Sequence, residues 1–113
     1  MSCGRAAYDG PMTSVLVITS NPDPASLTDT AGDAFATGAR AAGADVDVLD
    51  LYDSGFNPVY TLADRRHYLG HGPVPRDVTA IQSRLEKADV IALVFPVYWY
   101  TMPAMVKGLF DRV

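Results

Sequence analysis

Three short segments rich in apolar residues predict three β-strands. The first, residues 15–18, is β-branched and is closed by Asn21-Pro22-Asp23-Pro24, a sequence that neither a helix nor a central strand could include. The second, residues 45–51, alternates acidic and apolar residues, as a strand near a sheet edge does. The third, residues 90–95, is apolar at every position, which indicates a parallel strand covered by helices on both faces. We expect this third strand to be the most buried.

Between the strands, apolar residues three and four positions apart predict helices. The helix after the first strand should end at Gly43, which suits a helix C-terminus. Its apolar face is defined by Leu27, Ala31, Phe35, Gly38 and Ala42. A second helix is predicted for residues 77–88, and a third for residues 102–113 with Pro103 in its first turn. The Gly- and Pro-rich stretch before the second helix predicts a long loop with one helical turn at residues 63–68.

The order β-α-β-α-β-α predicts an α/β fold with a parallel sheet, because short right-handed crossovers bring each strand back in the same direction. A strand order of 2-1-3 would place the first strand in the middle. We expect residues 12–113 to form this one domain. Residues 1–11 have no periodicity and end in the turn signal Gly10-Pro11, so we interpret them as an extension or an alternative start outside the fold.

Open parallel sheets bind ligands beyond the carboxyl ends of the strands, where the chain reverses its direction of progress across the sheet. In a 2-1-3 order this point lies between the first and third strands, so residues 20–28 and 96–101 should meet there. The first loop brings hydroxyl and amide groups to a helix N-terminus, which favours phosphate. These groups belong to Ser20, Asn21, Ser26, Thr28 and Thr30. The second loop carries Tyr98-Trp99-Tyr100, a surface for a flat ring, so together the loops suggest a nucleotide or a flavin.

Each of these signals also has a purely structural interpretation. Ser26 or Thr28 could serve only as a helix N-cap. The aromatic residues could simply cover the core at the end of a strand. However, successive strand side chains alternate between faces, so three consecutive aromatics cannot all point inward, and at least one should project toward solvent or a ligand.

Composition excludes several classes of function. The net charge is −4 and no run of Lys or Arg occurs, so a nucleic-acid or anionic-membrane surface is not expected. The longest apolar run, residues 90–100, is far shorter than the roughly 20 residues of a membrane span. The single cysteine, Cys3, suits a reducing cytoplasm. His67, His71 and Asp64 match no metal motif, and we interpret the histidines as exposed loop residues and expect no metal site.

Two groups of charged residues receive no functional assignment from the sequence. Asp45, Asp47, Asp50 and Asp53 form an acidic edge that we expect to be solvated. Lys107 and Arg112 complement the dipole at the end of the last helix and need no further role.

Three segments of the chain resemble the NAD(P)H:quinone oxidoreductases, a flavodoxin-like group that includes the bacterial modulator-of-drug-activity enzymes. They are residues 15–28, residues 47–58 and, nearly position by position, residues 85–113. The resemblance implies a flavodoxin-like, doubly wound parallel sheet, of which this chain holds the first β-α-β-α-β-α part. It also implies a flavin cofactor, FAD before FMN, that takes hydride from NAD(P)H and passes it to a quinone or similar acceptor.

The resemblance also implies which residues hold the flavin. Those at the phosphate end are Asn21, Ser26, Leu27 and Thr28, and those along the ring, largely through backbone N–H groups, are Pro96, Val97, Tyr98, Trp99 and Tyr100. The three aromatic residues would in addition shape the catalytic slot that nicotinamide and quinone occupy in turn.

The chain departs from the family pattern in two respects. Members usually have His at the position of Asn21 and Asn at that of Thr28. They also continue for about another strand-helix-strand-helix, which would supply the second flavin loop. Without that portion the third strand becomes an edge strand. Three interpretations stay open: a fragment of an oxidoreductase, a chain that pairs its edge with a second copy or another polypeptide, and an inactive module that acts as a flavin carrier or assembly subunit.

Overall fold

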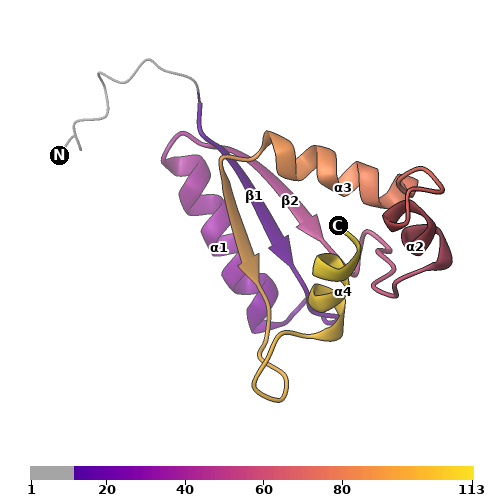
Figure 1. Ribbon diagram of the computed structural model, residues 1–113. Coiled ribbons are helices and arrows are strands. Elements are labelled where there is room, and N and C mark those ends of the chain that lie inside the picture. Colours follow the sequence, from indigo (N-terminus) through magenta and orange to yellow (C-terminus); the bar gives the residue numbers. More distant parts are fainter. Residues whose placement is uncertain (1–11) are drawn as a thin grey trace.

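The computed structural model describes residues 12–113, so the predicted extension, residues 1–11, lies outside the described part of the chain. The elements follow one another as β1 (Ser14–Thr19), α1 (Leu27–Ala41), β2 (Asp45–Asp50), α2 (Leu62–Tyr68), α3 (Arg76–Lys87), β3 (Val90–Val94) and α4 (Ala104–Arg112). Figure 1 shows the strands side by side with helices on both sides of the sheet. The predicted α/β order is therefore confirmed.

The sheet is parallel and has the predicted strand order, β2-β1-β3. Val17 of the central strand β1 lies opposite Val48 of β2 on one side and Ala92 of β3 on the other. Burial, however, differs from the prediction: β1 is the most buried strand, whereas Val90 and Ile91 of β3 are 44% and 48% exposed. The apolar residues of β3 suit a strand that helices cover on both faces. However, β3 lies at the edge of the sheet, so part of it stays exposed.

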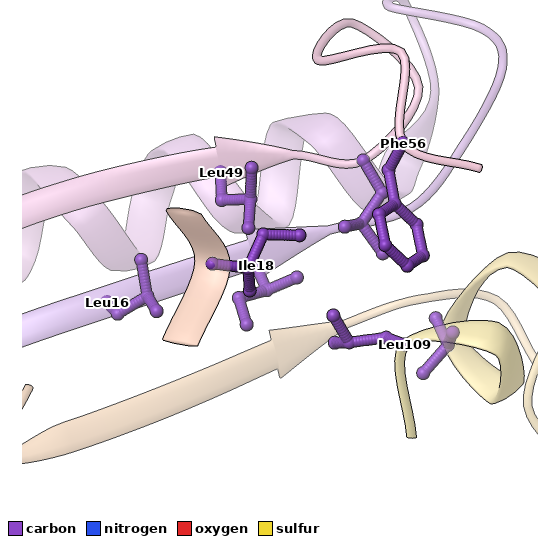
Figure 2. Close-up of a cluster of buried hydrophobic side chains, with 8 residues drawn as sticks. Leu16, Ile18, Leu49, Phe56 and Leu109 are labelled. Atoms are coloured by element: carbon purple, nitrogen blue, oxygen red, sulfur yellow. The ribbon is translucent and has the colours of Figure 1, made fainter. Parts of the chain in front are cut away.

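The core lies on both faces of β1, because its successive side chains point to opposite sides of the sheet. Leu16 and Ile18 point to one face, where they pack with Leu49 of β2, Phe56 and Leu109 of α4 (Figure 2). Val78 and Ile81 of α3 are buried as well, and Ile81 belongs to the same cluster. On the opposite face, Val15 and Val17 pack against Ala36 of α1. Each face of the sheet is thus covered by helices, as a doubly wound sheet requires.

The predicted buried face of α1 is wrong. Leu27 is 84% exposed and Phe35 is 44% exposed, whereas Thr28, Gly32 and Ala36 are buried. The reason is the close approach of the helix to β1: a Cβ atom on Gly32 would lie only 2.6 Å from Thr19 Cγ2. Where a helix packs this closely on a sheet, small residues and not large apolar ones mark the buried face.

Two helix boundaries also differ from the prediction. The expected helical turn in the long loop is α2, a helix of 7 residues that begins with a capping box between Thr61 and Asp64. Helix α4 begins at Ala104, so Pro103 is its N-cap and not part of its first turn, and Met102 precedes the helix. Within residues 12–113, no helix is both long and apolar enough to cross a membrane.

Candidate functional site

The two loops expected to form a ligand site both leave the sheet at its carboxyl edge. In Figure 1 the loop after β1 and the loop after β3 extend from the same end of the sheet. A backbone hydrogen bond ties them together at their bases: Ser20 N donates to Val94 O over 3.2 Å. The sheet therefore brings the N-terminus of α1 and the aromatic turn to one edge.

In the first loop, several polar side chains are used to build the loop itself. Ser26 is the N-cap of α1, and its Oγ accepts a hydrogen bond from Asp29 N at 3.2 Å. Asn21 accepts from Asp23 N at 2.9 Å and donates from Nδ2 to Thr28 Oγ1 at 3.4 Å. The structural interpretation of Ser26 as a cap is therefore confirmed. The donors that helix geometry leaves unbonded within α1 are the backbone N–H groups of its first turn, those of Leu27 and Thr28.

Two buried oxygen atoms at this end of the sheet have no hydrogen-bond partner. They are Ser20 Oγ and Asp29 Oδ1, the buried side-chain polar atoms of the described residues that lack one. Ser20 is only 1% exposed. Burial, and then the charges of Asp50, Asp33 and Asp23, raise the pKa of Asp29. Unpaired buried polar groups are rare in folded proteins and require an explanation.

The aromatic turn is a tight reversal closed by two hydrogen bonds between Tyr98 and Thr101. Tyr98 N donates to Thr101 O at 2.9 Å, and Thr101 N donates to Tyr98 O at 3.1 Å. Its central residues, Trp99 and Tyr100, have φ values of 48° and 70°, as in a type I′ turn. Residues with side chains are strained by about 1–3 kcal/mol each in this region, and such strain gathers at functional sites.

The side chains of the turn project away from the core. Trp99 is 91% exposed and Tyr100 is 97% exposed, while Tyr98 is about half-exposed at 45%. The prediction that the three aromatics cannot all point inward is confirmed. Because Tyr98 N–H is used within the turn, and Pro96 has no N–H, the backbone donors left at this loop are those of Val97, Trp99 and Tyr100.

A family model described as the flavodoxin-like fold matches residues 13–113. The chain belongs to the flavodoxin-like fold family. It is 35% identical over 103 residues to an uncharacterized NAD(P)H oxidoreductase, YcaK, of Escherichia coli K12, covering 88% of this chain and 51% of the relative. It is 28% identical to the ribosyldihydronicotinamide dehydrogenase (quinone) of Pongo abelii, covering 88% of this chain and 50% of that protein.

Solved structures give the same result. An NAD(P)H:quinone oxidoreductase from Methanothermobacter marburgensis superposes with a TM-score of 0.83 at 28% identity, covering 90% of this chain and 53% of the other. The resemblance to flavodoxin-like NAD(P)H:quinone oxidoreductases is thereby confirmed. The chain spans about half the length of the curated relatives it matches.

This flavodoxin-like chain contains a buried charge cluster that its sequence pattern does not reveal. Arg112 was assigned only to the dipole of α4, yet its side chain is 2% exposed. Its Nε donates to Asp64 Oδ2 at 2.8 Å, and its Nη1 donates to Asp77 Oδ2 at 2.6 Å and to Asn57 O at 2.7 Å. Its Nη2 donates to the other oxygens of Asp64 and Asp77, and its guanidinium lies 5.6 Å from the centre of the Phe56 ring. No residue spacing signalled this, because both carboxylates are far away in the chain.

The Arg112 cluster, meaning Arg112, Asp64 and Asp77, carries two negative charges and one positive charge. Burial alone would raise the pKa of Asp64, but hydrogen bonds from Arg112 and Thr61 outweigh it, and the pKa lies below its usual value. The hydrogen bond from Arg112 lowers the pKa of Asp77. A cleft lies beside the cluster, lined by α2, α3 and α4 and not by the two loops. Since Arg112 and Asp64 are paired with each other, we assign the cluster to joining these helices.

Two other polar sites also differ from their predictions. His67 belongs to α2 and not to a loop, and its Nδ1 lies 3.0 Å from Gly72 O. In the described part of the chain, no three His, Cys, Asp or Glu side chains are arranged to hold a metal ion. Asp47, expected to be simply solvated, accepts two hydrogen bonds of 2.8 Å from Arg84, which lowers the pKa of Asp47.

Proposed function

We propose that this chain forms the first half of a flavin site in an NAD(P)H:quinone-type oxidoreductase. The observation that supports this most directly is the pairing, at one sheet edge, of a helix N-terminus with a strained and exposed aromatic turn. A flavin bound there would accept hydride from NAD(P)H and deliver it to a quinone or similar acceptor. The protein's part is to hold the phosphate and the ring in fixed positions.

The residues at the phosphate end are compatible with such a ligand. The first-turn N–H groups of Leu27 and Thr28 suit an anion, and the positive end of the helix dipole adds to the attraction. Asn21 and Ser26 keep this turn in place through their hydrogen bonds. The unpaired Oγ of Ser20 at the base of the loop is a further polar group in this region. We propose FAD as the cofactor, with FMN as the second choice.

At the ring end, we propose that Pro96, Val97, Tyr98, Trp99 and Tyr100 contact the isoalloxazine. The exposed faces of Trp99 and Tyr100 offer apolar area for a planar ring. The remaining backbone N–H groups of the turn would donate to the electron-rich reduced ring. Tyr98, Trp99 and Tyr100 would also form the catalytic slot for nicotinamide and quinone in turn.

A second candidate function is a flavin carrier or an assembly subunit. It is favoured by the exposed edge strand, where Val90 and Ile91 are 44% and 48% exposed. Pairing of β3 with a second copy in a homodimer, or with another polypeptide, would cover this edge. We propose the cytoplasm as the location because the sequence contains a single cysteine.

The experiment that tests the flavin proposal uses Trp99, the only tryptophan of the chain, as a built-in fluorescent reporter. Titration with FAD or FMN should quench its emission in a saturable manner and raise the thermal unfolding temperature. Tyr100→Ala should weaken binding by on the order of tenfold through lost stacking. Tyr68→Ala is the matched control, because Tyr68 is also exposed, at 79%, but belongs to α2.

A protein that shows neither quenching nor thermal stabilisation by flavin would refute both the enzyme and the carrier. Equal losses in Tyr100→Ala and Tyr68→Ala would refute the role of the turn. Oxidation of NAD(P)H with a soluble quinone by the flavin-loaded protein separates the enzyme from the carrier.

A further inference from the structure

Asp29 lies in the first turn of α1, three residues after the N-cap, but it does not act as a capping residue. Its counterpart in α2 is Asp64, which accepts a hydrogen bond from the backbone N of its N-cap Thr61 at 2.7 Å. In α1 the N-cap Ser26 instead donates its backbone N–H to Asp23 O at 3.1 Å. Asp29 Oδ1 is left buried without a partner. Helix capping therefore explains Asp64 but not the side chain of Asp29.

The electrostatic surroundings of Asp29 are unfavourable for a carboxylate. Burial is the largest cause of the raised pKa of Asp29, and the charged groups that raise this pKa further are all carboxylates. They come from each side: Asp50 from the end of β2, Asp33 from the next turn of α1, and Asp23 from the first loop. The adjoining end of β1, Thr19 and Ser20, brings no charge. No cation among the described residues appears among the groups that act on Asp29, so only the positive end of the α1 dipole opposes its charge.

We propose that Asp29 is a specificity-determining residue that opposes a flavin phosphate at the N-terminus of α1. This inference rests on the proposed function and deepens it. The positive end of the helix dipole amounts to about half a unit charge, so a carboxylate in the first turn offsets much of its attraction for an anion. The site then binds a phosphorylated flavin most tightly when Asp29 is neutral. A flavin without phosphate, such as riboflavin, is insensitive to this charge.

The test compares Asp29→Asn with Asp33→Asn. The two variants remove the same charge from one helix, but Asp33 lies one turn farther from the N-terminus and is exposed. Quenching of Trp99 fluorescence measures the affinity for FAD and for riboflavin. FAD is preferred to FMN because a phosphate monoester itself titrates near pH 6. Asp29→Asn should bind FAD on the order of fivefold more tightly, with riboflavin unchanged and with a much smaller effect in Asp33→Asn.

The pH dependence gives a second readout. Affinity of the wild type for FAD should rise as the pH falls from neutral toward acid, and this rise should be clearly smaller in Asp29→Asn. A second neutral variant, Asp29→Ser, guards against a folding defect specific to Asn. An equal gain for FAD and riboflavin, or an equal gain in Asp29→Asn and Asp33→Asn, would overturn the inference.

A separate measurement decides the inference if no flavin binds, in which case the proposed function fails. Pyrophosphate is then titrated, with the backbone N–H signals of Leu27 and Thr28 followed by NMR. Tighter binding to Asp29→Asn than to the wild type supports the role of Asp29. Equal affinities, or no binding to either protein, would overturn it.

Discussion

Replacing Arg112 with Met should be among the most destabilising single changes in the chain. Arg112 donates hydrogen bonds to two carboxylates and one carbonyl and joins α4 to α2, α3 and the segment around Asn57. Methionine keeps much of the apolar volume beside Phe56 but removes every donor. The change therefore isolates the electrostatic part of the contact.

The magnitude follows from burial. Asp64 is 4% exposed, so loss of Arg112 leaves its charge buried and without a cation. Breaking a buried pair in this way destabilises a protein by about 3–5 kcal/mol. Asp77 is 48% exposed and can recover water, so it should add little to that cost. The loss should therefore come mainly from Asp64, and Arg112→Met/Asp64→Asn should recover part of it.

The assay is urea unfolding followed by circular dichroism, with Lys107→Met as the matched control. Lys107 lies on the same helix and pairs with Asp111, but it is 62% exposed, so its loss should cost less than about 1 kcal/mol. If Arg112→Met is no less stable than Lys107→Met, the cluster does not stabilise the fold. If Arg112→Met/Asp64→Asn is no more stable than Arg112→Met, the reasoning based on the isolated carboxylate is wrong.

Three further predictions concern the turn, the close packing of α1 and acid unfolding. Tyr100→Gly should raise the free energy of unfolding by about 1 kcal/mol, because glycine accepts the positive φ without strain, while flavin binding falls; unchanged stability in urea would show that the turn is not strained. Gly32→Ala should lower the free energy of unfolding by about 1–3 kcal/mol because the new Cβ atom meets Thr19. Gly38→Ala, which has open space around it, should raise the free energy of unfolding by about 0.5–1 kcal/mol. Similar shifts of the thermal unfolding temperature in the two variants would contradict the packing argument. Asp64 and Asp77 have lowered pKa values, so the stability that their ionised forms provide is complete above about pH 3.9, the ordinary pKa of Asp, and is lost as the pH falls through the lowered values. Urea unfolding at a series of pH values should show this loss in the wild type and a smaller loss in Arg112→Met.

The sequence was sufficient for the topology because the topology depends on periodicity and on turn signals. The apolar runs, the two prolines after β1 and Gly43 after α1 marked the elements, and short parallel crossovers then led to the order β2-β1-β3. The convergence of the two loops followed from that order. These features are local in the chain or follow from general rules of connection.

What the sequence did not predict depends on distance and fit between separate segments. Leu27 and Phe35 lie on an exposed face because Gly32 lets α1 approach β1 so closely. The charge cluster joins Arg112 to Asp64, which is 48 positions away, and no periodic pattern connects them. The left-handed backbone conformation of Trp99 could not be predicted from the sequence either, because the residues that usually mark such a turn are Asn and Gly. Strain of this kind is expected where function and local preference conflict.

The Arg112 cluster also sets an order on folding during synthesis. Asp64 and Asp77 leave the ribosome well before Arg112, and bringing them together without it would be opposed by their repulsion, since the charge of Asp64 raises the pKa of Asp77 in the folded protein. Helices α2 and α3, of 7 and 12 residues, are too short to be stable by themselves, so their docking with α4 and the arrival of Arg112 should stabilise all three helices together. Because the contact between Arg112 and Asp64 closes a long stretch of chain, it should form late in folding and should mainly slow the rate of unfolding.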